Sequence, residues 1–153
     1  MCIRDRSQIS TGANTTLKLS ADTEITSSSD YTFGTVNLSG KKLTMGGNGG
    51  LTLPNALNMT AGSAIETKTS DLTLSSALQL GTGSITSTGG TLSFAGGLTV
   101  GGTGSMSVLD SILSVSQNLN FPTTASFESS VLDLQGATTP VSYTHLRAHE
   151  TLR

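Results

Sequence analysis

Short apolar–polar–apolar triplets recur along residues 17–134 in a constant order. Two triplets come first, a turn rich in Gly, Ser and Thr follows, and one further large apolar residue completes the unit. One such unit contains LTL at 72–74, LQL at 78–80 and then Ile85. The outer residues of a triplet share one face of a β-strand, and the middle residue points to the other face. The pattern therefore predicts three short strands per unit and leaves no room for a helix.

Three apolar columns keep nearly the same period when the units are aligned. The first triplet ends at Phe33, Leu53, Leu74, Phe94, Val115 and Leu134. The second triplet begins at Leu17, Val36, Leu57, Leu78, Leu98 and Leu119. The single apolar residue is Ile25, Leu43 or Met45, Ile65, Ile85, Met106 and Phe127. A period of about 20 residues in three columns indicates an internal repeat, and the register stays open between residues 21 and 50.

We predict an all-β fold, namely a right-handed parallel β-helix (a β-solenoid) with about six coils of ~20 residues and three short strands per coil. Strands stacked at ~4.8 Å let each coil bury its apolar residues against the neighbouring coils of the same chain. An antiparallel β-sandwich or meander is the alternative fold.

The two ends of the chain do not follow the repeat. Residues 1–6 (MCIRDR) and the run VSYTHLRAHET from residue 141 resemble the translation of a sequencing-library adapter, one at each end and in the matching orientation. We therefore divide the chain into an adapter-derived, non-native segment 1–6, a solenoid segment 7–140 and a second non-native segment 141–153. We expect both ends to lie outside the coil stack, and residues 7–140 to be a fragment of a longer, metagenomic protein.

Charge and cysteine content exclude several classes of partner and of fold. Residues 7–140 contain four lysines against eight acidic residues, so this segment is mildly acidic and offers no basic patch for nucleic acid. The one Cys, Cys2, lies in the first segment, which excludes a disulfide framework. No apolar run has the length of a transmembrane helix.

The middle residues of the triplets form two outward columns. The first column is Thr32, Thr52, Thr73, Ser93, Ser114 and Asp133. The second column is Lys18, Asn37, Asn58, Gln79, Thr99 and Asn120. We interpret them as solvated ladders in which stacked hydroxyls and amides hydrogen-bond between coils. The alternative is a ligand surface. A flat Thr array could bind ice, but ice-binding solenoids generally show two outward Thr per strand, and these triplets show one.

Residues 7–140 lack the groups on which most enzymes depend. They contain no His and no Cys, and we expect no catalytic residue, no cofactor and no metal site. Glu66 and Glu128 follow the single apolar residue and so share a column, but about three coil spacings, ~14 Å, separate them, which is too far for cooperation. His145 and His149 have the spacing of a metal site on a helix, but the adapter translation accounts for both.

The period near 20 and the turns GTGSI (81–85), GTGSM (102–106) and TGG (88–90) resemble the passenger regions of autotransporters and related filamentous bacterial adhesins. The resemblance covers about residues 17–134. It implies export, a location outside the cell or at the bacterial outer membrane, and a non-catalytic structural or adhesive role. The implied partner is a host surface or a carbohydrate.

Two other functions stay open. The chain could supply the inert coils of a polysaccharide-cleaving or phage tail-spike β-helix, whose catalytic residues lie on other coils. An ice-binding solenoid is the lower alternative.

Overall fold

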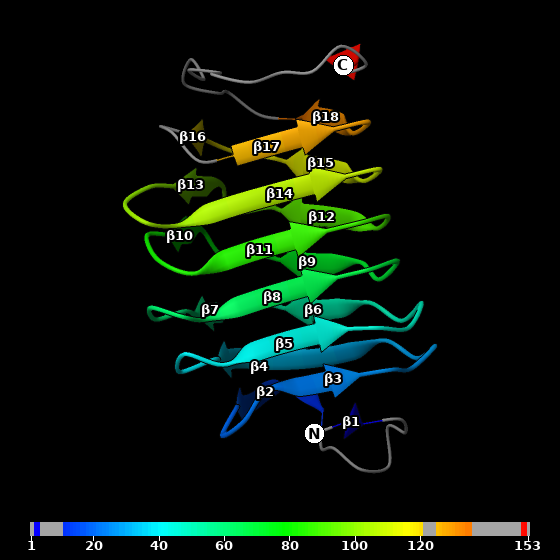
Figure 1. Cartoon of the computed structure of the whole chain (residues 1–153), viewed down its shortest axis with the longest axis vertical. Coiled ribbons are helices and arrows are strands. Elements are labelled where there is room, and N and C mark those ends of the chain that lie inside the picture. Colours follow the sequence, from blue (N-terminus) through cyan, green and yellow to red (C-terminus); the bar gives the residue numbers. More distant parts are fainter. Residues whose placement is uncertain (1, 4–10, 121–124, 136–150, 153) are drawn as a thin grey trace.

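The chain winds into stacked coils of short parallel strands (Figure 1). The computed structural model describes residues 2–3, 11–120, 125–135 and 151–152. All strand pairs among these residues are parallel, and the coils form a right-handed parallel β-helix of about six turns without a helix in the described part. The predicted solenoid is therefore confirmed, and the antiparallel alternative is wrong. Within the same ranges no helix has the length and apolarity needed to cross a membrane.

Three faces enclose the interior, and we number them in the order in which the chain visits them. The first face contains β6 (Leu51–Leu53), β9 (Leu72–Leu74), β12 (Thr91–Phe94), β15 (Ile112–Val115), β18 (Val131–Leu134) and β19 (Thr151–Leu152). The second face contains β7 (Ala56–Asn58), β10 (Leu78–Leu80), β13 (Leu98–Val100) and β16 (Leu119–Asn120). The third face contains β1 (Cys2–Ile3), β3 (Thr23–Ile25), β5 (Lys42–Met45), β8 (Ala64–Thr67), β11 (Ser84–Ser87), β14 (Ser105–Leu109) and β17 (Ala125–Glu128).

Two longer strands connect the first and second faces near the beginning of the chain. These are β2 (Gly12–Lys18) and β4 (Tyr31–Asn37). The beginning of β4 pairs with β6, and its end pairs with β7. We number the coils by residues: coil 1 is 12–29, coil 2 is 30–49, coil 3 is 50–70, coil 4 is 71–90, coil 5 is 91–111 and coil 6 is 112–120 with 125–130.

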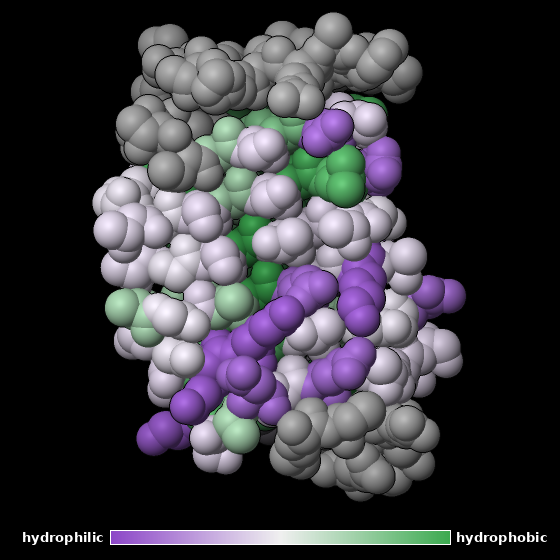
Figure 2. Space-filling model, viewed as in Figure 1, coloured by the Kyte–Doolittle hydropathy of each residue, from purple (hydrophilic) through white to green (hydrophobic). Residues whose placement is uncertain are grey.

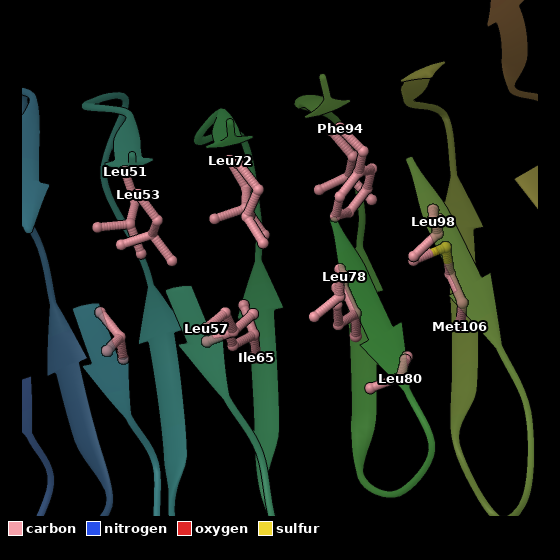
Figure 3. Packing of buried hydrophobic residues seen from close by; sticks show 14 of the residues in the cluster. Leu51, Leu53, Leu57, Ile65, Leu72, Leu78, Leu80, Phe94, Leu98 and Met106 are labelled. Carbon is pink, nitrogen blue, oxygen red and sulfur yellow. The ribbon is translucent and has the colours of Figure 1, made fainter. Parts of the chain in front are cut away.

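The interior consists of apolar rows that run along the axis (Figure 3). On the first face the row Leu51, Leu72, Leu92 is in strict register, and each of these side chains is at most 1% exposed. Burying a Leu, Ile, Val, Phe or Met side chain contributes about 1.5–3 kcal/mol. The stack of apolar rows is therefore the main stabilising interaction of the fold.

The third face differs from the prediction, because it has two inward columns instead of one. The first column is Thr23, Leu43, Ile65, Ile85, Met106 and Ala125. The second column is Ile25, Met45, Thr67, Ser87, Val108 and Phe127. The single column that we expected mixed members of both. The second column was missed because its middle members, Thr67 and Ser87, are polar although they are completely buried.

The described parts of the two ends also differ from the expectation that they stand apart from the stack. Cys2 and Ile3 pair with Glu24 and Ile25, and Thr151–Leu152 pairs with β18. The physical reason is that the last strand of a sheet presents unpaired N–H and C=O groups to any extended segment nearby. The adapter origin of segments 1–6 and 141–153 stays a prediction.

Candidate functional site

The first outward column is a continuous row on the first face. Its members are Thr32, Thr52, Thr73, Ser93, Ser114 and Asp133. Each residue is the direct in-register neighbour of the next, and each is half-buried. The six residues therefore lie in one in-register row, and their use as a contact surface stays a prediction. The row presents hydroxyl groups at the strand spacing of about 4.8 Å and ends on a carboxylate.

The second outward column is interrupted. Lys18, Asn37 and Asn58 are in register, and so are Gln79, Thr99 and Asn120. Asn58 donates a hydrogen bond from Nδ2 to Asn37 Oδ1 at 2.5 Å, as expected for an amide ladder. No strand pairing joins Asn58 to Gln79, because β7 and β10 do not form a ladder. The sequence predicted the two halves and missed the break between them.

The third face displays a hydroxyl array that the sequence reasoning did not identify. Ser84 and Thr86 point outward from β11, and they lie in register with Ser105 and Ser107 of β14. These strands therefore carry two outward hydroxyl residues each. The signal is present in the alternation S-I-T-S and S-M-S-V, but the expected pattern assigns this strand a single apolar residue, Ile85 or Met106, and no outward residues.

Charged side chains gather on the same face in the earlier coils. Figure 2 shows a large hydrophilic area in its lower half, over β3, β5 and β8. Lys42 forms an ion pair with Glu66 of the next coil. Lys68 Nζ lies 3.6 Å from Glu24 Oε1, so this pair reaches from coil 3 to coil 1. Both pairs are partly solvent-exposed, and such pairs contribute about 0.2–1 kcal/mol each.

Gly46 makes room for the longer of these ion pairs. It lies in coil 2, between the coils that supply Glu24 and Lys68. A Cβ at Gly46 would lie 2.7 Å from Glu24 Oε1 and 2.9 Å from Thr26 Cγ2. The missing side chain therefore allows the Glu24 carboxylate to extend across coil 2 toward Lys68.

Three aspartates hold neighbouring coils together through the backbone. Asp22 Oδ1 accepts a hydrogen bond from the Lys42 N–H at 2.9 Å. Asp30 and Asp71 do the same for the N–H groups of Gly50 and Thr91, at 2.7 and 2.8 Å. Hydrogen bonds to a carboxylate are stronger than neutral ones. These acids therefore link coil 1 to coil 2, coil 2 to coil 3 and coil 4 to coil 5.

The acidic residues that we had aligned do not share a column. Glu66 lies in register with Thr44 and Thr86, whereas Glu128 pairs with Leu109. The error arose because Phe127 belongs to the second inward column of the third face. No group of three or more His, Cys, Asp and Glu residues in the described ranges is arranged to hold a metal ion. His145 and His149 lie outside the described residues.

The geometry defines the class of the protein as a parallel β-solenoid. No protein-family model, no curated protein and no solved structure matches the chain.

Proposed function

We propose that the chain is a non-catalytic structural or adhesive segment of a secreted or cell-surface bacterial repeat protein, similar in role to an autotransporter passenger. Its partners would be a host surface or a carbohydrate, contacted by many weak interactions along the solenoid. The outward columns Thr32, Thr52, Thr73, Ser93, Ser114 and Asn37, Asn58, Gln79, Thr99, Asn120 would form the contact surfaces.

The use of the acidic residues carries this proposal. Glu24 and Glu66 are paired with lysines, and Asp22, Asp30 and Asp71 accept backbone hydrogen bonds from the next coil. A pair of carboxylates that hydrolyses a glycosidic bond must instead face one substrate across a short distance. Because these acidic side chains bond neighbouring coils to one another, they support a structural role.

The shape of the outward faces supports the same role. Residues 72–109 contain no charged side chain, and four of their outward positions on the third face, Ser84, Thr86, Ser105 and Ser107, carry hydroxyl groups. A solenoid spreads such groups over an extended surface instead of gathering them in a pocket. Repeated weak contacts on one scaffold gain strength by multivalency.

The proposal is tested by attaching the chain to microspheres at high and low density. We expect retention on host-cell or polysaccharide-coated surfaces that rises steeply with density, because binding is multivalent. The chain is also incubated with a polysaccharide panel, and we expect no release of reducing ends. Release of reducing ends without density-dependent retention would contradict the proposal and favour a polysaccharide-cleaving β-helix.

One observation favours a second function, ice binding. The pairs Ser84/Thr86 and Ser105/Ser107 place two hydroxyl residues per strand on the third face, as an ice-binding solenoid generally does with Thr. A thermal-hysteresis measurement separates the two functions. Hysteresis that is lost in a Thr86→Lys variant, and kept in a Thr73→Lys variant on the first face, would support ice binding over adhesion.

A further inference from the structure

The junction between coil 3 and coil 4 differs from the other junctions in its strand pairing. The first and third faces continue through it, by the pairs β6–β9 and β8–β11. On the second face β7 pairs only with β4, and β10 pairs only with β13. All residues from 50 to 90 are described, so the missing ladder is a feature of this junction. Two strand edges therefore face each other without backbone pairing.

Side-chain bonds are missing at the same junction. Side chains link the coils at each of the remaining junctions from coil 1 to coil 6. Examples are the pairs Asp22–Lys42, Asn37–Asn58, Ser87–Ser111 and Val108–Ser130. Between coil 3 and coil 4, both fully described, no side-chain hydrogen bond or ion pair is formed. The two coils are held by apolar packing and by backbone bonds on two faces.

The interior of this junction also lacks a polar contact between the two coils. Thr67 lies on β8 opposite Ser87 of β11. The Thr67 Oγ1 atom is buried without a hydrogen-bond partner, whereas the Ser87 hydroxyl bonds to Ser111 of coil 5 at 2.9 Å. A buried polar group without a partner costs about 1–3 kcal/mol. Leu57 and Leu78, on either side of the missing ladder, are 7% and 4% exposed, whereas Leu98 of their row is 1% exposed.

The turns that follow the two strands also differ in length at this junction. Residues 59–63 connect β7 to β8, whereas only residues 81–83 connect β10 to β11. The longer turn is fastened to coil 2, since Ser63 Oγ accepts a hydrogen bond from the Gly40 N–H. We propose that the junction of coils 3 and 4 is a conformational joint, at which the solenoid opens into two blocks, residues 12–70 and 71–134, before either block unfolds.

Residue-resolved amide hydrogen exchange of the full chain tests the joint. Amides that bond across a junction exchange when that junction opens. Two matched pairs of donors occupy the same columns. At the joint, Ser75 N–H donates to Leu53 O (3.1 Å) and Ser84 N–H donates to Ser63 O (3.0 Å). At the next junction, Ala95 N–H donates to Leu74 O (2.9 Å) and Ser105 N–H donates to Gly83 O (3.0 Å).

We expect Ser75 and Ser84 to exchange at least about tenfold faster than Ala95 and Ser105, after correction for intrinsic rates, because the joint opens separately from global unfolding. Ser116, which bonds in the same way one coil nearer the end, controls for fraying. Equal rates at the two junctions, or slower exchange at the joint, would overturn the proposal.

Two engineered disulfides sharpen the test in a Cys2→Ser background. Thr52→Cys with Thr73→Cys locks the joint, and Thr73→Cys with Ser93→Cys locks the next junction; both are in-register neighbours on one face. Adjacent strands lie about 4.8 Å apart, within the Cα range of a disulfide. The first disulfide should slow Ser75 and Ser84 to the rates of Ala95 and Ser105, and the second should leave them fast. Equal effects of the two disulfides would overturn the proposal.

Discussion

Coils 1–3 and coils 4–6 have the same apolar interior, but different side chains join them. Charged residues are frequent in coils 1–3, where the pairs Lys42–Glu66 and Lys68–Glu24 cross the third face. Residues 72–109 carry no charge, and the later coils are joined by serine hydroxyls such as that of Ser111 and by the Asp71 carboxylate, without an ion pair among the described residues. The backbone ladder and the apolar rows define the fold, and more than one kind of outward chemistry can fasten it.

The difference has a consequence for stability in salt. Ion pairs at the surface are screened as ionic strength rises, whereas bonds between buried hydroxyls and backbone groups are not. Coils 1–3 should therefore respond to salt, and coils 4–6 should not. Three variants test this comparison in order of expected effect.

The largest effect is expected from a charge in the shared interior. Leu92 is completely buried, and Leu92→Asp removes an apolar side chain and buries an unpaired carboxylate. We expect a loss of more than about 4 kcal/mol, measured as the urea midpoint by circular dichroism. Ser93→Asp is the matched control, because Ser93 points outward and should tolerate the charge. Similar midpoints for the two variants would show that the inward and outward assignments are wrong.

A smaller effect is expected at the corner of coil 5. The Ser111 hydroxyl bonds to Ser87, donates to Leu109 O at 2.6 Å and accepts from the Gly89 N–H at 2.8 Å. Ser111→Ala leaves these groups without a partner and should cost about 1–3 kcal/mol, equally at low and high salt. Ser105→Ala, on the exposed surface, should change the urea midpoint little. A loss that disappears in high salt would contradict the proposed contrast between the blocks.

The smallest effect is expected from the ion pair of coils 2 and 3. Lys42→Met removes the partner of Glu66 and should cost less than about 1 kcal/mol. The difference from the parent chain should vanish near 1 M salt, where the screening length falls to about 3 Å. Lys41→Met is the control, since Lys41 forms no ion pair among the described residues. A Lys42→Met effect that persists at 1 M salt would show that the charges are not the cause.

The sequence was sufficient for the apolar rows, because inward Leu, Val and Phe residues recur at a fixed interval in both triplets. It was not sufficient where the interior is polar. Thr67 and Ser87 occupy inward positions on the third face, so the apolar pattern did not reveal the second inward column there. The expected alignment of Glu128 with Glu66 was wrong for the same reason.

The outward columns were also predictable in part. Their members follow from the strand alternation alone, and all residues of the first column lie where we expected them. The break between Asn58 and Gln79 was not predictable, because both triplets have the ordinary pattern.

The central claim is that successive repeats stack in register along one axis. It is tested most directly by double electron–electron resonance between spin labels on the first outward column, in a Cys2→Ser background. One label is placed at Thr32 and the other at Ser93, Ser114 or Asp133, which lie three, four and five coils away along the row. In-register stacking gives Cα separations near 14, 19 and 24 Å, rising by about 4.8 Å per coil. Separations that fail to rise in this order, as in a sandwich where distant repeats lie side by side, would contradict it.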